Sequence, residues 1–152
     1  MGSVTLDDLR RLLAAAQGLT AVTSLRSDGT VSASLVNAGV VPHPVSGEEV
    51  VGFVVRGAAA KLPRYRRQRH ATAIVHAGWE WAAASGPVEL AGPDDPLDGL
   101  DPAVLPELLR SVFRAAGGTH DDWDAYDRAM VQQRRAAVLV RPARLDGNVS
   151  GS

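Results

Sequence analysis

The sequence predicts an α+β fold, in which a mostly antiparallel barrel of about six strands is flanked by helices. Strand-like runs occur in pairs joined by turn signals, and helical segments do not alternate regularly with them, which argues against a doubly wound parallel sheet. The chain has 152 residues, of which 45% are hydrophobic and 22% charged. These values are ordinary for a globular protein, so we expect residues 1–152 to form a single domain.

The N-terminal segments predict a helix followed by a β-hairpin. Thr5 and Asp8 have the spacing of a capping box, and the leucines that follow recur at helical intervals. Residues 19–26 and 31–40 are strand-like, and the aspartate–glycine pair between them is a strong hairpin signal. The chain is therefore expected to begin with a short helix and two antiparallel strands.

The middle of the chain predicts three further strands and one short helix. Residues 48–56 are rich in valine and indicate a buried strand. Residues 57–69 indicate a loop that runs into a basic helix, with Pro63 in the first turn, where a missing N–H does no harm. Residues 70–92 predict two strands joined by a turn near an alanine–glycine pair.

The C-terminal third predicts two helices and a closing strand. Residues 101–118 have a helical pattern that ends in two glycines. A second helix is expected from Thr119, whose spacing from Asp122 again matches a capping box. Residues 134–145 then predict one strand.

Composition limits the classes of function. The net charge of −1 gives no attraction to nucleic acid or to an anionic membrane. Because the chain has no cysteine, disulfides, thiolate metal sites and cysteine nucleophiles are excluded. The first residues carry acids early and have no long apolar run, so we expect neither a secretion signal nor a membrane anchor, and a cytoplasmic location.

A basic cluster is the first candidate binding site. Lysine occurs once, at Lys61, whereas the other 15 of the 16 basic residues are arginines. In the predicted helix Lys61 and Arg64 share one face, and Arg56 ends the preceding strand. A loop that leads into a basic helix start suits a phosphate or another anion. The alternative is a solvated basic face of an amphipathic helix.

Two tryptophans form the second candidate. Trp79 and Trp81 lie two apart in a predicted strand, so both rings should point to the same side, and Glu80 to the other. They could form one wall of a pocket for a planar ring, or fill the core or a subunit contact. The small residues around Gly86 leave room for a ligand or for another backbone.

The acidic segment around His120 is interpreted as structural. Its aspartates lie at the start of the predicted helix, and Arg134 and Arg135 lie at its end, as the helix dipole favours. None of the four histidines has metal-ligand spacing, and no motif of a nucleophilic or acid–base enzyme is present. An enzyme that takes its reactivity from a cofactor would have such a sequence.

The chain resembles the pyridoxamine-5′-phosphate-oxidase-like superfamily in four segments that occur in the same order: SLRSDGTVSASLVNAGV, VVGFVVRGAAAKLPRYRR, HAGWEWAAASGPVELAGPDDP and FRAAGGTHDDWDAYDRAMVQQRRAAVLVRP. Within that superfamily it is most similar to the actinobacterial branch that binds the deazaflavin coenzyme F-420. The most distinctive part is GWEW followed by GGTHDDWDAYD, and the likeness extends over residues 19–148.

This resemblance implies a homodimer of split β-barrels with flanking helices and with two cofactor sites at the subunit interface. Lys61 matches the family's lysine after the third strand, which meets the phosphate and acidic tail of a non-covalently held cofactor. The candidate cofactor site comprises Lys61, Arg56, Arg64, Ser34, Asn37, Trp79 and Trp81. No catalytic side chain and no metal ligand is expected, and the remaining partner is a small-molecule substrate.

Two departures from the family pattern concern the anion site. Where related sequences read Lys-x-x-Asn-Leu-Arg, this chain has Arg64 in place of the neutral amide. His76 stands where relatives often carry arginine. FMN therefore stays an alternative to F-420 as the cofactor.

The function that the resemblance implies is hydride transfer from reduced F-420 to an unsaturated or conjugated small organic substrate. We expect no obligatory protein acid, with solvent or a backbone group managing the proton. The alternatives are an FMN-dependent oxidase of the pyridoxamine-phosphate-oxidase type and a non-catalytic protein that binds a flavin or deazaflavin.

Overall fold

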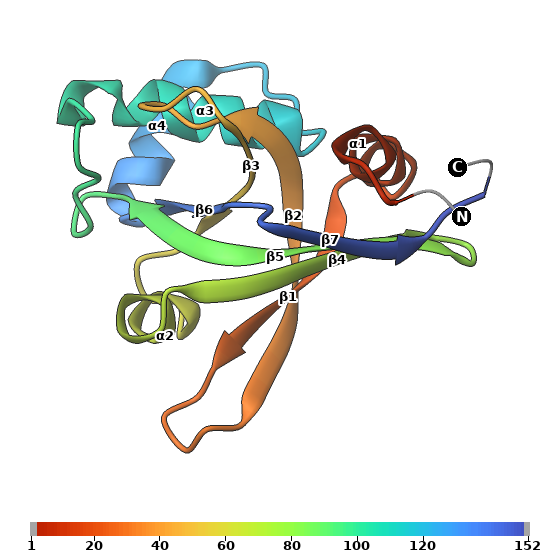
Figure 1. Cartoon of the computed structure of the whole chain (residues 1–152). Coiled ribbons are helices and arrows are strands. Elements are labelled where there is room, and N and C mark those ends of the chain that lie inside the picture. The colour runs from red at the N-terminus through yellow and green to blue at the C-terminus, as the bar shows by residue number, and fades with distance from the viewer. Residues whose placement is uncertain (1–2, 151–152) are drawn as a thin grey trace.

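The chain folds into a closed antiparallel β-barrel with helices on its outside (Figure 1). The structure is a computed structural model and describes residues 3–150. Around the barrel the strand order is β1, β2, β3, β6, β5 and β4, and the ring closes by pairing of β4 with β5. The six strands of the ring are β1 (Leu19–Leu25), β2 (Val31–Pro42), β3 (Glu49–Val55), β4 (His70–Ala77), β5 (Glu80–Ala91) and β6 (Ala136–Val140). An additional strand, β7 (Arg144–Asn148), pairs with β5.

Two long strands each belong to both halves of the barrel. Residues 31–37 of β2 pair with β1, and residues 38–42 pair with β3. In the same way, residues 80–87 of β5 pair with β4, and residues 88–91 pair with β6. The predicted antiparallel α+β barrel is therefore confirmed, and its split character arises from these two shared strands.

Four α-helices lie around the barrel, and one short 3-10 turn, Pro102–Val104, precedes the third of them. No helix among residues 3–150 is long and apolar enough to cross a membrane. Figure 1 shows α3 and α4 together over one end of the barrel, α1 beside β2, and α2 near β1 and β4. The helices are α1 (Leu6–Ala15), α2 (Lys61–Arg67), α3 (Leu105–Ala115) and α4 (Trp123–Gln132).

Two clusters of buried apolar side chains stabilise this arrangement. One fills the barrel and includes Phe53 and Tyr65, whose rings meet edge to face with centroids 6.3 Å apart. The other lies between the barrel and α3, where Leu109, Val112 and Tyr126 are buried. Each side chain of this size contributes about 1.5–3 kcal/mol on burial, so the outer cluster fixes α3 firmly against the barrel.

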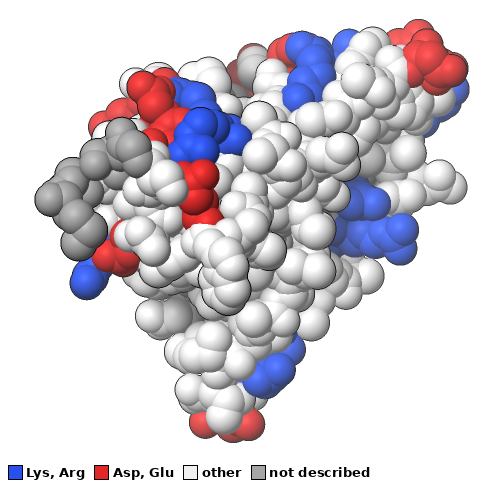
Figure 2. Space-filling view, turned by 90° about the vertical axis from the view of Figure 1, so that its right-hand side faces the viewer, with Lys and Arg blue, Asp and Glu red and all other residues white. Residues whose placement is uncertain are grey.

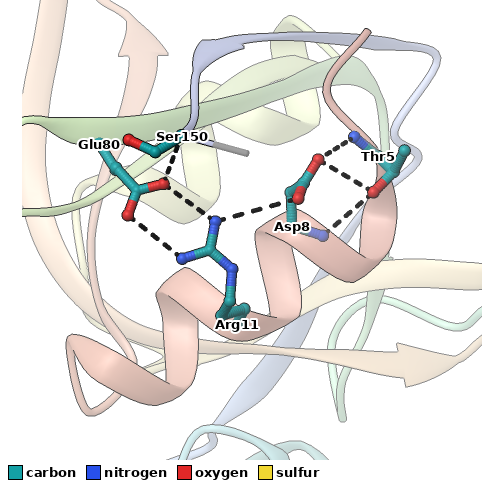
Figure 3. A network of polar contacts seen from close by, with 5 residues as sticks. All are labelled: Thr5, Asp8, Arg11, Glu80 and Ser150. Carbon is teal, nitrogen blue, oxygen red and sulfur yellow. Dashed lines mark hydrogen bonds and ion pairs between the residues drawn. The ribbon is translucent and has the colours of Figure 1, made fainter. Parts of the chain in front are cut away.

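The first helix is held by a polar network that reaches the end of the chain (Figure 3). Thr5 and Asp8 form the predicted capping box, since each accepts the backbone N–H of the other. Arg11 donates to Glu80 of β5 at 3.1 and 3.3 Å, and the Ser150 N–H donates to the same carboxylate at 2.7 Å. The hydrogen bond from Arg11 is the main reason why the pKa of Glu80 is lowered. The network thereby fixes α1 to the rim of the barrel.

The C-terminal end of α3 lies against the backbone of β2. A Cβ atom on Gly39 would lie 2.3 Å from the carbonyl carbon of Ala115, and one on Gly18 would lie 2.3 Å from the carbonyl oxygen of Ala116. Only glycine allows so close an approach of two backbones.

Gly39→Ala is therefore expected to lower the free energy of unfolding by about 1–3 kcal/mol, because the added methyl group must push α3 away from β2. Chemical denaturation of the variant measures this loss. Gly29→Ala is the comparison, since a Cβ there meets no atom within 4 Å and only the positive φ of 88° has a cost. Equal stability of Gly39→Ala and wild type would show that the contact is loose.

Three local expectations from the sequence are wrong. The helix expected from Thr119 begins at Trp123, with Asp122 as its N-cap. The single closing strand is two strands, because the chain turns after Val140 and β7 returns to pair with β5. Trp79 lies in the turn between β4 and β5, outside either strand.

The space beside Gly86 was expected to suit either a ligand or another backbone, and in the structure another backbone lies there. A Cβ atom there would lie 1.9 Å from the carbonyl oxygen of Arg141. The absence of a side chain therefore allows the segment between β6 and β7 to cross β5 closely.

Candidate functional site

A cavity of about 620 Å³ lies between the outer side of the barrel and helices α3 and α4. Its size is in the range of small-molecule and cofactor sites. Strands β2 and β3 form one wall, the start of α2 forms one end, and aromatic and aliphatic side chains of α3 and α4 form the other wall. The lining residues include Asn37, Val55, Arg56, Lys61, Phe113, Tyr126 and Arg135.

Three cationic side chains line this cavity, and no carboxylate lines it with them. The Lys61 Nζ donates to the Ser34 hydroxyl at 3.0 Å, and the Arg135 Nε donates to the Gln133 side-chain oxygen at 2.8 Å. Both of these acceptors are neutral. The Arg56 side chain has no hydrogen bond or ion pair with any of residues 3–150. The cavity thus concentrates positive charge that the described chain does not neutralise.

Arg135 is half-buried at this cavity and lies close to Arg56. Burial lowers the pKa of its guanidinium, and the neighbouring Arg56 lowers it further. Its neighbour in sequence, Arg134, shows the opposite effect, because a hydrogen bond to Asp94 raises the pKa of that guanidinium. A half-buried cation beside a second cation, without a counter-ion, is typical of a site for an anionic ligand.

The remaining polar residues predicted for the site lie at different distances from the cavity. Ser34 contacts Lys61 directly, and Asn37 lines the cavity while its Nδ2 donates to the Gln17 carbonyl at 3.2 Å. Arg64 does not line the cavity, and its guanidinium donates to the Ser24 hydroxyl of β1 at 3.4 Å. The structure therefore brings Lys61, Arg56, Ser34 and Asn37 together and leaves Arg64 outside the cavity lining.

The two predicted tryptophans do not line this cavity within the chain. Trp79 is 95% exposed in the β4–β5 turn, which is formed with Gly78 at a positive φ of 62°. Trp81 lies in β5 between its strand partners His76 and Asn148 and is half-buried. The expectation that both rings share one side of a strand is therefore wrong, because the turn interrupts the alternation before Trp79.

Sequence reasoning missed Arg135 and the aromatic wall of Phe113 and Tyr126. Arg135 was assigned to the end of the second helix, but α4 ends at Gln132, and the chain then turns at Arg134, where φ is 50°. This turn directs Arg134 to Asp94 and leaves Arg135 at the cavity. A pair of adjacent arginines contains no sequence signal that distinguishes these two roles.

The acidic segment before α4 supplies the cap of that helix. The Asp122 carboxylate accepts the N–H of Ala125 at 3.0 Å and caps α4. The His120 ring packs among Phe113, Trp123 and Tyr126, with centroids 5.7–6.5 Å apart. Among residues 3–150, no three histidine, aspartate or glutamate side chains gather closely enough to hold a metal ion.

Asp122→Asn is expected to lower the free energy of unfolding by about 1 kcal/mol or less, through weaker capping and dipole terms. Its affinity for F-420 should stay within about twofold of wild type, because Asp122 does not line the cavity. Denaturation and a binding titration of the same preparation measure both quantities. A folded variant that lost cofactor binding would identify Asp122 as functional.

Comparison with known proteins assigns the fold. No family model matches the sequence. A conserved hypothetical protein from Mycobacterium tuberculosis superposes with a TM-score of 0.68 at 14% identity, over 98% of this chain and 94% of its own. A pyridoxamine 5′-phosphate oxidase-related, FMN-binding protein from Nostoc punctiforme gives 0.64 at 12% identity, over 97% and 86%. An F-420 reductase gives 0.59 at 14% identity, over 90% and 94%.

The chain has the split β-barrel fold. Its six-stranded closed barrel and flanking helices are shared with proteins described as FMN-binding and as an F-420 reductase. At 12–14% identity this likeness is one of fold. The chemistry of the site in this split β-barrel therefore depends on the residues that line its cavity.

Proposed function

We propose that this split β-barrel is an F-420-dependent reductase, which transfers a hydride from the reduced deazaflavin to an electrophilic carbon of an unsaturated or conjugated small organic substrate. The observation that carries the proposal is the cluster of Arg56, Lys61 and Arg135 around one cavity, without a carboxylate among the lining residues. The shared fold with an F-420 reductase supports it.

The residues of the cavity suit a cofactor with a planar ring and an anionic tail. Arg56, Lys61 and Arg135 offer only donors, which are the groups that bind phosphate and carboxylate oxygens. On the opposite wall, Phe113 and Tyr126 offer aromatic surface for a ring, with centroids 4.9 Å apart. The tail is therefore assigned to the cationic end, and the ring to the apolar part between β2 and α3.

The lining of the cavity offers no histidine or carboxylic acid that could donate a proton. The Tyr126 hydroxyl lines it but donates to the Leu109 carbonyl at 3.1 Å, and burial raises the pKa of this hydroxyl. When bound, the reduced deazaflavin supplies the hydride. The proton then comes from solvent or from a backbone group.

The deciding experiment is a binding titration against F-420, FMN and FAD, followed by turnover of any bound cofactor with conjugated enones. The proposal expects the tightest binding for F-420. Tighter binding of FMN would instead favour an FMN-dependent oxidase, for which the likeness to an FMN-binding protein is the supporting observation. Binding without turnover would indicate a cofactor-binding protein, and no binding by any of the three would contradict the proposal.

We further propose that the protein acts as a homodimer that covers the outer face of β4, β1 and β2. In this face Leu35, Ala21 and Ile74 form one cross-strand row. Leu35 is 66% exposed, and Val31 and Leu19 nearby are also exposed. Uncharged surface fills the middle of the side shown in Figure 2, above the tip of the β1–β2 hairpin. An apolar face of this kind is typical of an interface.

The proposed interface is continuous with the cavity, because Leu35 belongs to both. A second copy on this face would exclude water from the open side of the cavity. We assign Trp79 and Trp81 to this contact, in which the exposed ring of Trp79 gains a buried environment.

Sedimentation is expected to show a dimer at micromolar concentration. Ile74→Glu, which places a charge in the cross-strand row, should shift the protein to monomer without unfolding it, because Ile74 is already 38% exposed within the chain. Circular dichroism is the control for folding. A wild-type monomer under these conditions would rule out the interface.

A further inference from the structure

A second cavity, of about 790 Å³, lies between α1 and the C-terminal end of α3. Strand β2 forms its floor, and the exposed side of α1 forms one wall. Its lining is mostly small or apolar and includes Arg10, Leu13, Ala14, Gln17, Val40 and Gly118.

The second cavity adjoins the first. Asn37, Phe113 and Ala116 line both of them, so the two spaces border each other at these residues. The first cavity holds the cationic cluster at its far end, where β3 ends and α2 begins. A ring in the first cavity could therefore meet a molecule in the second at this border.

The two cavities differ in charge. Arg10 is the one charged residue of the second lining, and carboxylates already neutralise it: Asp7 accepts from it at 2.9 Å, and Glu49 forms a second ion pair. The helices α1 and α3 also end at this cavity, and helix C-termini carry partial negative charge. An anion would thus find no free cation in the second cavity, whereas it finds three in the first.

The walls of the second cavity are fixed before any ligand arrives. Arg11 and Glu80 hold α1 to the barrel, as Figure 3 shows. Asn37 is tied to the Gln17 carbonyl at 3.2 Å. A preformed apolar space with few polar groups is typical of a site for a small organic molecule.

We propose that the second cavity binds an uncharged, conjugated organic molecule, which is the hydride acceptor, and that it discriminates against anions. The role of acceptor rests on the proposed function, but the binding of an uncharged molecule in this cavity does not. The charge difference between the cavities keeps the anionic cofactor and the uncharged acceptor in separate places.

The test uses two probes of nearly equal shape, methyl 4-nitrobenzoate and the 4-nitrobenzoate anion, measured by titration calorimetry. The uncharged ester should bind wild type, and Ala14→Phe should weaken this binding at least roughly tenfold, because the new ring fills the cavity. Ala15→Phe is the matched control: it is exposed on the same helix and does not line the cavity, so the affinity should not change. Thermal melting confirms that both variants fold.

The anion should bind in the first cavity and lose affinity in Lys61→Ala, whereas the ester should not respond to that change. Saturating F-420, or FMN if F-420 does not bind, should compete with the anion and leave the ester's affinity unchanged. The inference would be overturned if the ester and the cofactor competed for binding, or if Ala14→Phe and Ala15→Phe weakened the binding of the ester equally. If neither cofactor binds but the ester remains sensitive to Ala14→Phe, the proposed function fails while the second site stands.

Discussion

Replacing Lys61 with alanine should weaken F-420 binding by about ten- to a hundredfold. A charge-assisted hydrogen bond to a phosphate or carboxylate contributes roughly 1.5–3 kcal/mol, which corresponds to that range of affinity. Among residues 3–150 the Lys61 ammonium donates only to a neutral hydroxyl, that of Ser34, so no carboxylate of this part of the chain competes with the ligand for it. Fluorescence titration with F-420 at low salt measures the change.

Two comparisons make the Lys61 result specific. Lys61→Arg should lose less affinity than Lys61→Ala, since the charge remains but a planar fork replaces a compact ammonium. Arg69→Ala removes a positive charge from an exposed residue just beyond the same helix, outside the cavity lining, and should leave the affinity unchanged.

Added salt should weaken wild-type binding more than binding by Lys61→Ala, because screening acts on the contact that the variant has lost. If Lys61→Ala bound F-420 as tightly as wild type at low salt, Lys61 would be a solvated surface charge and the site would lie elsewhere.

The fold was predictable from the sequence because its signals are local. The capping box of Thr5 and Asp8, the aspartate–glycine hairpin and the valine-rich strand each depend on a few neighbouring residues. The position of the last strand does not depend on a local signal. Pro142 is a local signal against one continuous strand, but nothing in residues 141–148 indicates that β7 returns to pair with β5, which is far away in the sequence.

Only those site residues that lie close together in the sequence could be predicted from it. Lys61 and Arg56 lie within one loop and its flanks, so their proximity follows from sequence order. Arg135 joins them through the β3–β6 pairing, in which Val55 lies opposite Ala136. That register places the residue before Ala136 next to the residue after Val55, and no single-segment pattern reveals it.

Arg135 should lower the stability of the cofactor-free protein but strengthen the binding of F-420. In the cofactor-free protein its guanidinium is partly desolvated beside Arg56, and its only hydrogen-bond partner among the described residues is the neutral amide of Gln133. Arg135→Met removes this repulsion and keeps an unbranched side chain in place of the arginine's aliphatic stem. The cofactor-free variant should therefore be as stable as wild type, or more stable by up to about 1 kcal/mol, since solvent still screens a half-buried charge.

The same replacement should weaken F-420 binding at least about tenfold, because the cofactor's anionic tail loses one of three cations. Arg134→Met is the matched control: it breaks an exposed ion pair with Asp94 outside this cavity, so it should lower stability slightly and leave binding unchanged. Denaturation without cofactor and titration with F-420 measure the two effects. If Arg135→Met were less stable than wild type and still bound F-420 normally, Arg135 would serve the fold. A cation retained for a ligand should instead lower the stability of the free protein and become stabilising only once that ligand binds.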